Sequence, residues 1–208
     1  EPYLLALLEE PVVLDPRYLA FGAFALALIH HGRGYQAKAA KVITATSTHL
    51  LEMDEQLAHT LTTCFRVELA LRQGNAAEAR LLSKSNNQAR LPGLYCYPLE
   101  LTEPKLLLAE RTPQSLAAAR TLLDDPTLYL GQPQYDKTRI DVMALLALVH
   151  DALGEEDAFA ALSAALEQGE PGGFVRNFVD LGPPMADLLG RLYSQKSVHP
   201  FRLSYLAE

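Results

Sequence analysis

The chain has 208 residues, of which 49% are hydrophobic and 21% are charged, a composition typical of a folded protein rather than a disordered one. Its net charge is −7 and its basic residues do not cluster, which argues against direct nucleic-acid contact by this segment. No apolar run reaches the roughly 18–20 residues that a membrane-spanning helix needs. Two cysteines do not make a disulfide framework, and free thiols suit a reducing compartment, so we expect a cytoplasmic protein without membrane contact.

A turn pattern recurs along the chain about every 40 residues. Three copies carry a glycine, at Gly32, Gly74 and Gly154, and in the fourth copy Pro113 stands in the turn instead. Each turn is followed by a small side chain in a helical run; these side chains are Ala37, Ala79, Ala118 and Ala158. Because glycine ends a helix in the left-handed conformation and alanine allows a close helix approach, the pattern predicts a helix hairpin.

The apolar residues before and after each turn follow the helical period, so each copy reads as two amphipathic helices. The first helices are expected at 17–31, 55–73, 99–110 and 136–153. The second helices are expected at 35–51, 76–86, 113–124 and 156–168. One such hairpin cannot bury its own apolar stripe, so neighbouring hairpins are expected to stack. The sequence therefore predicts an all-α fold, a right-handed α-solenoid of about four TPR-like hairpins forming a single domain over 1–208. Its repeats are expected at 17–51, 55–86, 99–124 and 136–168.

The stretch EPGGFVRNFVDLGPPMADLL at 170–189 combines helix-breaking glycines and prolines with apolar side chains. We expect Phe174, Phe178 and Val179 to form a short helix that lies over the last hairpin. A further helix is expected from Met185 to about residue 193, and a last one within 199–208. Since the end of a solenoid exposes an apolar face, residues 174–208 are predicted to form its cap, and we expect Arg176 to fasten this cap.

Residues 160–192 closely resemble the end of the helical sensor domain in MalT-like regulators, the large ATP-binding members of the LuxR group of transcription activators. In that family a helix ending in ALxLAEPxG runs into (F/Y)VRxFxDxGxPMxxLL. The matching residues here are Glu170, Pro171, Gly173, Phe174, Val175, Arg176, Phe178, Asp180, Gly182, Pro184, Met185, Leu188 and Leu189. The resemblance is specific over this stretch and weak over the upstream hairpins, because helical repeats are common.

The resemblance implies a modular protein with an N-terminal ATPase, a winged helix, this repeat domain and a C-terminal helix-turn-helix. The chain begins without Met, so we expect it to be a fragment that holds only the repeat domain. Inducers or regulatory proteins act on that domain in the family, and their binding would bias the ATPase between a resting and a multimeric state. No GxxxxGK[ST] motif occurs, so ATP is expected only in the absent module and no cofactor in this fragment. Self-association is left open.

No pattern in the sequence indicates an enzyme. The six histidines do not have the spacing of a zinc site, and no GxSxG motif is present. Acidic pairs such as Glu155 with Glu156 lie at expected helix ends, where we interpret them as solvated caps. We therefore expect neither a catalytic site nor a metal site.

The candidate binding residues are polar side chains that interrupt the apolar stripes of the first helices or lie near the irregular start of the third hairpin. They are His59, Arg66, Glu68, Arg72, Tyr95, Tyr97, Glu103 and Arg139. Arg66 lies among apolar neighbours and needs a partner, which cannot be Glu68 because side chains two apart on a helix point in different directions. Its partner is either a carboxylate on another helix or an anionic ligand.

The alternative to a sensor is a TPR-type protein-protein interaction scaffold that binds no small molecule. A Walker A motif upstream and a helix-turn-helix downstream in the full-length gene would favour the sensor. A concave pocket would favour a small-molecule inducer, and a wide groove would favour a peptide or protein.

Overall fold

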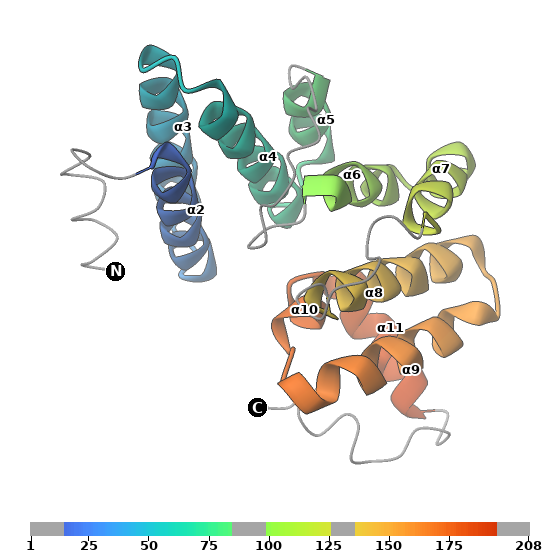
Figure 1. Cartoon of the computed structure of the whole chain (residues 1–208). Coiled ribbons are helices and arrows are strands. Elements are labelled where there is room, and N and C mark those ends of the chain that lie inside the picture. The colour runs from blue at the N-terminus through green and yellow to red at the C-terminus, as the bar shows by residue number, and fades with distance from the viewer. Residues whose placement is uncertain (1–14, 85–98, 126–135, 195–208) are drawn as a thin grey trace. The chain divides into compact units, whose positions relative to one another are not determined.

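The computed structural model describes residues 15–84, 99–125 and 136–194, and all regular structure in these ranges is helical, with no strand (Figure 1). The chain divides into two compact units, Glu1–Leu91 and Pro92–Glu208. No helix within the described ranges is long and apolar enough to cross a membrane. The all-α prediction is therefore confirmed, whereas the solenoid, the number of repeats and the single domain stay predictions.

The described part of the first unit, residues 15–84, contains two helix hairpins. Its helices are α2 (Pro16–Gly32), α3 (Gln36–Glu52), α4 (Gln56–Arg72) and α5 (Ala76–Lys84). Helix α2 begins where the Asp15 side chain accepts a hydrogen bond from the backbone N–H of Arg17, with Pro16 in the first helical position. Helix α4 packs against both α2 and α3, so the second hairpin lies directly on the first. This is the packing by which an amphipathic hairpin buries its stripe on a neighbour.

The turn between α2 and α3 shows where the repeat pattern was misaligned by two residues. Gly34, not Gly32, has the left-handed backbone, with φ +79°, and Gly74 has the same conformation in the second hairpin. Gly32 is the last residue of α2. The small side chain that lets the helices approach is Ala39, which is fully buried, whereas Ala37 is exposed. In both possible pairs, Gly32 with Ala37 and Gly34 with Ala39, the glycine and the alanine are five residues apart. Their spacing therefore does not distinguish the two pairs.

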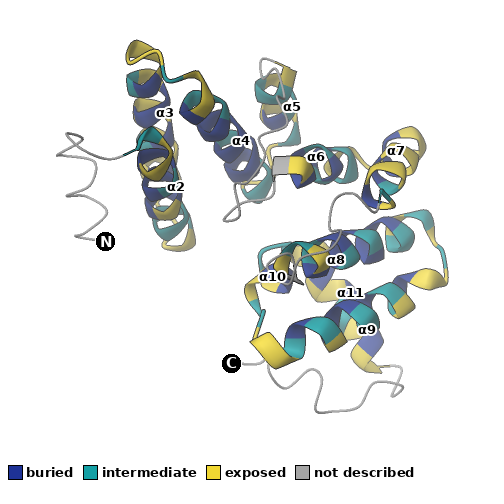
Figure 2. Ribbon diagram, viewed as in Figure 1, coloured by how far each residue is buried: buried dark blue, intermediate teal, exposed yellow. Residues whose placement is uncertain are grey.

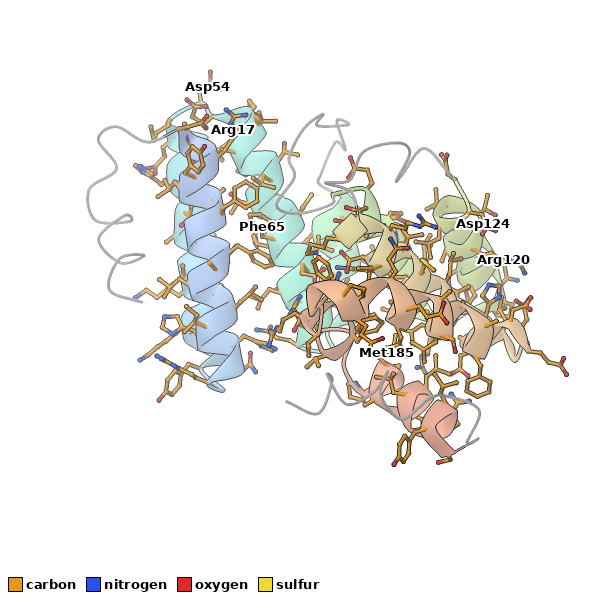
Figure 3. The ribbon with its side chains drawn as sticks, turned by 60° about the horizontal axis from the view of Figure 1, so that its bottom comes forward. Arg17, Asp54, Phe65, Arg120, Asp124 and Met185 are labelled. Carbon is orange, nitrogen blue, oxygen red and sulfur yellow. The ribbon has the colours of Figure 1, made fainter. Side chains whose placement is uncertain are left out.

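The core of the first unit centres on Phe65 of α4, which is fully buried (Figure 3). Its ring stacks on that of Phe24 from α2 with centroids 4.1 Å apart and planes inclined by 3°. Phe21 of α2 lies at a tilt with its centroid 5.4 Å away. These aromatic contacts join the second hairpin to the first, and such pairs contribute about 0.5–1.5 kcal/mol beyond the area they bury.

The second unit contains two further hairpins and a C-terminal segment packed on the last of them. Its elements are η1 (Leu99–Leu101), α6 (Thr102–Glu110), α7 (Pro113–Leu123), α8 (Asp136–Leu153), α9 (Asp157–Gly169), η4 (Glu170–Gly172), α10 (Arg176–Val179) and α11 (Pro183–Ser194). Helices α6 and α7 pair, α7 packs on α8, and α8 pairs with α9. The predicted bounds of the hairpin helices agree with the observed ones to within one residue, apart from the 3-10 turn before α6. The predicted end at residue 86 of the helix that begins at Ala76 lies outside the described residues.

The turn between α6 and α7 has no glycine and uses Arg111 in its place. Arg111 has φ +53°, a conformation that costs a residue with a Cβ roughly 1–2 kcal/mol. Helix α7 then starts with a capping box, in which Thr112 and Ser115 each accept a hydrogen bond from the other's backbone N–H. The buried small residue is Ala119, whereas the predicted Ala118 is exposed. Ala79 and Ala158 are buried as predicted.

Residues 170–189 fold onto the hairpin of α8 and α9, as predicted for the start of the cap. Phe178, Met185 and Leu188 are buried among side chains of α8 and α9, with at most 1% of each exposed. Met185 is labelled in Figure 3. Phe174 is partly buried against the same cluster. The short helix α10 contains Phe178 and Val179 but not Phe174, which precedes it, and Val179 is 52% exposed. The helix expected within 199–208 lies outside the described residues.

Arg176 does not fasten this segment, contrary to our expectation. Its guanidinium is exposed and pairs with Asp180 at 2.6 Å, one helical turn further along. Asn177 makes the connection instead: its side-chain N–H donates to Asp141 Oδ1 of α8 at 2.6 Å and to the Lys137 carbonyl at 3.3 Å. An amide that is itself buried, with 7% exposed, can hold α10 on α8, whereas a guanidinium at the surface cannot.

Candidate functional site

The candidate binding residues of the second hairpin lie on two different faces of α4. Ten of the 17 residues of α4 are buried, so few of its side chains reach solvent (Figure 2). His59 and Arg66 are half-buried and share a face with Thr63, since the three are spaced four and three residues apart. Glu68 and Arg72 lie on the face that carries Leu61 and Phe65.

On the face that carries His59 and Arg66, the Arg66 guanidinium forms no hydrogen bond or ion pair with any described residue. Thr63 is already satisfied, because its hydroxyl donates to the His59 carbonyl at 3.0 Å. The carboxylate on another helix that we considered for Arg66 is therefore not found within the described ranges. Because a half-buried cation without a counter-charge is poorly stabilised, Arg66 is the residue of this face best suited to an anion.

Glu68 and Arg72 pair with one another. Arg72 Nε lies 2.9 Å from Glu68 Oε1, and the Arg72 and Glu68 side chains are 16% and 5% exposed. The pairing is between residues four apart on one helix, so Glu68 faces Arg72 rather than Arg66, as the spacing argument requires. Both side chains are largely buried, which makes the pair part of the packing of α4.

The remaining candidates are dispersed. Glu103 is half-buried on α6, and Arg139 is exposed on α8, where it pairs with no described residue. Tyr95 and Tyr97 lie outside the described residues. His59 and Arg139 occupy matching positions, each 15 residues before the turn glycine of its hairpin (74 − 59 and 154 − 139). The ligand-binding roles of these residues stay predictions.

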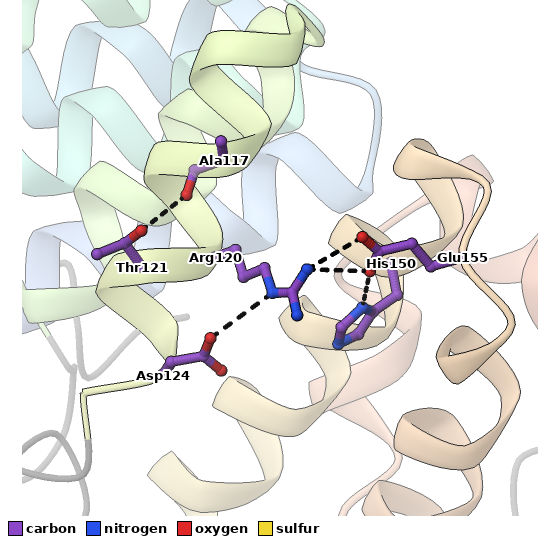
Figure 4. Close-up of polar contacts among 6 residues, drawn as sticks. All are labelled: Ala117, Arg120, Thr121, Asp124, His150 and Glu155. Atoms are coloured by element: carbon purple, nitrogen blue, oxygen red, sulfur yellow. Dashed lines mark hydrogen bonds and ion pairs between the residues drawn. The ribbon is translucent and has the colours of Figure 1, made fainter.

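Sequence reasoning missed a polar cluster that joins α7 to the turn between α8 and α9 (Figure 4). Arg120 Nη1 of α7 donates to both carboxylate oxygens of Glu155, at 3.0 and 3.3 Å. His150 Nδ1 of α8 lies 2.5 Å from Glu155 Oε2. Arg120 Nε also lies 3.7 Å from Asp124. Glu155 is therefore not the solvated cap that we expected, because it links two helices.

The electrostatics of this cluster favour an ionised Glu155. The hydrogen bond with His150 and the positive charge of Arg120 lower the pKa of the Glu155 carboxyl below its ordinary value, and the partial loss of hydration opposes this shift. Arg120 contacts the carboxylates of both Glu155 and Asp124, so the cluster is an ion-pair network. It holds α7 on the last hairpin.

The described ranges contain no group of three or more His, Cys, Asp or Glu side chains that could bind a metal ion. Comparison of the chain with family models, with characterised proteins and with solved structures found no match.

Proposed function

We propose that this chain is the signal-sensing helical-repeat domain of a MalT-like, LuxR-type transcriptional regulator. The observation that carries the proposal is the folding of residues 170–189 onto the last hairpin. The residues of the family-like motif have matching physical roles there: Gly173 and Gly182 have positive φ, and Phe178, Met185 and Leu188 are buried. These roles explain why a segment with such an order of glycines, prolines and apolar residues would end a repeat domain.

The proposed ligand is an anionic small molecule that binds to the face of α4 bearing His59 and Arg66. Arg66 supports this choice because it is half-buried and has no counter-charge among the described residues. Its planar guanidinium can donate two parallel hydrogen bonds to a carboxylate or phosphate. Binding would favour one arrangement of the hairpins, and the attached ATPase module would sense that change as a population shift.

A thermal-shift screen of metabolites on this chain tests the proposal. A ligand at 100 times its Kd stabilises a protein by about 2.7 kcal/mol, which for a domain of this size raises Tm by several degrees. We expect shifts from anionic compounds, and we expect the Arg66→Gln variant to lose them. Lys41→Gln, an exposed change on α3, is the matched control and should keep them. Shifts that survive in Arg66→Gln, or the absence of any shift, would contradict the proposed site.

The second candidate function is a protein-protein interaction scaffold without a small-molecule ligand. It is favoured by large apolar side chains exposed in the first unit, at Tyr18, Leu51 and Met53, which are 62%, 53% and 48% exposed. Apolar side chains at a surface are typical of sites that contact other proteins. This candidate predicts that no metabolite shifts Tm, whereas a protein partner protects these side chains from solvent.

A further inference from the structure

The turn before α3 and the first part of α3 carry positive charges without negative ones, and we call residues 33–41 the basic end of α3. Its charged side chains are all exposed; they are Arg33, Lys38 and Lys41. No Asp or Glu occurs anywhere in residues 16–51. Tyr35 is 52% exposed, and the Lys38 ammonium lies over its ring, 4.8 Å from the centroid. The basic end therefore presents a large aromatic side chain among cations.

The turn after α3 has the opposite charge, and we call residues 51–55 the acidic end of α3. Its charged side chains are Glu52, Asp54 and Glu55, and no Lys or Arg occurs in residues 42–65. Leu51 and Met53 stand between the carboxylates in the sequence and are 53% and 48% exposed. The acidic end therefore presents aliphatic side chains among anions.

Two ion pairs close to these ends are neutral in themselves and leave the two charges unbalanced. Arg17, at the start of α2, is paired with Asp15, and Figure 3 shows Arg17 and Asp54 at the same end of the first unit. At the end of α4, beside the start of α3, Arg72 is paired with Glu68. Neither pair supplies a counter-charge to α3.

The stability of α3 does not account for the charges at its ends. A helix has a partial positive charge at its N-terminus and a partial negative charge at its C-terminus, so Lys38 in the first turn and Glu52 at the last position are both unfavourable. Asp54 has φ +58°, in a turn position where Gly34 and Gly74 have φ of +79° and +75°. Glycine adopts this conformation without the steric cost that a Cβ adds. Contact with an oppositely charged surface would account for these side chains.

The two ends of α3 are complementary but cannot meet within one molecule. Helix α3 has 17 residues and is therefore about 25 Å long, and it separates the two turns (Figure 1). The ammonium groups at one end match the carboxylates at the other, and the exposed Tyr35 ring matches the exposed Leu51 and Met53 side chains. Complementary charge around an apolar centre is the arrangement of a protein interface.

We propose that the acidic end of α3 in one molecule binds the basic end of α3 in a second copy of this chain. Glu52 and Asp54 then pair with Lys38 and Lys41, and Tyr35 packs on the aliphatic side chains between the carboxylates. The two surfaces differ, so the contact is heterologous, and copies add head to tail instead of closing as a symmetric dimer. The proposal goes beyond the function proposed above and does not depend on it.

Sedimentation velocity of the chain tests the proposal over a range from about 1 μM to about 1 mM. We expect a weight-average mass that rises with concentration and passes the mass of a dimer. Because exposed charge pairs are screened by salt, raising NaCl from about 50 mM to about 500 mM should weaken association about tenfold or more. A monomer at every concentration, or a mass that stops at that of a dimer, would overturn the proposal.

Two double variants each remove one of the two surfaces. Glu52→Gln with Asp54→Asn removes charge from the acidic end, and Asn is tolerated at a positive φ. Lys38→Gln with Lys41→Gln removes charge from the basic end. Each variant alone should remain monomeric. An equimolar mixture should form a one-to-one dimer and grow no further, because only one acidic end and one basic end remain intact in each pair.

The matched control is Glu156→Gln with Asp157→Asn, which removes the same charge at exposed positions at the start of α9. It should associate as the parent chain does, which separates a local contact from an effect of net charge. Association of either end variant at the strength of the parent chain would show that another surface is responsible. A mixture of the two end variants that stays monomeric would also refute the head-to-tail contact.

Discussion

The last hairpin of the second unit and the first hairpin of the first unit differ in whether an apolar helix face is covered. The face of α8 and α9 is covered by α10 and α11, which bury Phe178, Met185 and Leu188. On α2, by contrast, Tyr18 and Ala25 are exposed, and Leu28 and Ile29 are partly exposed. The comparison teaches that the sequence of an amphipathic helix does not show whether the chain also contains a segment that covers its apolar face. Only the covering segment, with its glycines and prolines, carries that information.

The largest expected effect comes from breaking the covered face. Phe178→Ala removes a fully buried ring from the cluster on α8 and α9, and such changes cost about 3–5 kcal/mol of unfolding free energy. Urea unfolding measured by circular dichroism checks this value. The control is the adjacent Val179→Ala, which should cost less than about 0.5 kcal/mol because Val179 is 52% exposed. Similar losses for both variants would contradict the covered arrangement.

The next largest effect is a difference in stability loss between matching alanine substitutions on α2 and α4. The bounds of α2 and α4 differ by 40 at both ends, so Ile29 and Leu69 occupy matching positions. Leu69 is 4% exposed, whereas Ile29 is partly exposed. Leu69→Ala is expected to cost about 2–4 kcal/mol and Ile29→Ala roughly half as much or less, because water already reaches Ile29. The measurement is the urea midpoint of each variant at an unchanged m-value. Equal losses would mean that α2 is covered to the same extent as α4.

The acid response of the second unit depends on Glu155, whose pKa is lowered in the folded state. A carboxyl with a lowered folded pKa contributes stability above its unfolded pKa, about 4.3 for Glu, and this contribution is lost as the pH falls through the folded value. Glu155→Gln should therefore have a lower Tm than the parent chain at pH 7, with the gap closing below about pH 4. Glu156→Gln, a change at an exposed neighbour, should show no such gap. A gap for Glu155→Gln that persists at about pH 3 would exclude the ionised pair as its cause.

The smallest effect is a gain in stability at the turn between α6 and α7. Arg111→Gly places a residue without a Cβ at φ +53°, and relief of the strain minus the entropy of glycine leaves about 0.5–1 kcal/mol of added stability. Arg111→Ala keeps the Cβ and should give no gain. Thermal unfolding of the two variants, compared with the parent chain, separates backbone relief from the loss of the guanidinium.

The sequence predicted the helices well because their apolar periodicity is a local property. Its errors arose where the local pattern offered two equivalent choices. In HGRGYQAKAA both Gly32 with Ala37 and Gly34 with Ala39 satisfy the five-residue spacing, and only the packing of α3 on α2 selects the second pair. In SLAAAR three alanines follow one another, so the buried Ala119 could not be distinguished from the exposed Ala118.

The polar contacts between distant segments were not predictable from the sequence. Arg120 and Glu155 are 35 residues apart, and no spacing rule connects them. Arg176 was singled out by its place in the family-like motif, whereas the residue that fastens α10 to α8 is its neighbour Asn177. Helix periodicity indicates which face is apolar, but the pairing of polar side chains depends on how the faces meet.

The position of Phe65 has a spectroscopic consequence. The chain contains no tryptophan, so an indole introduced at one site would be the sole emitter at wavelengths beyond tyrosine fluorescence. At position 65 it would lie against Phe24 and Phe21 in a water-free environment and shift its emission to the red when the first hairpins separate. A second variant with the indole at position 178 would report on the segment that covers α8 and α9, so the unfolding of each unit could be followed through its own tryptophan emission.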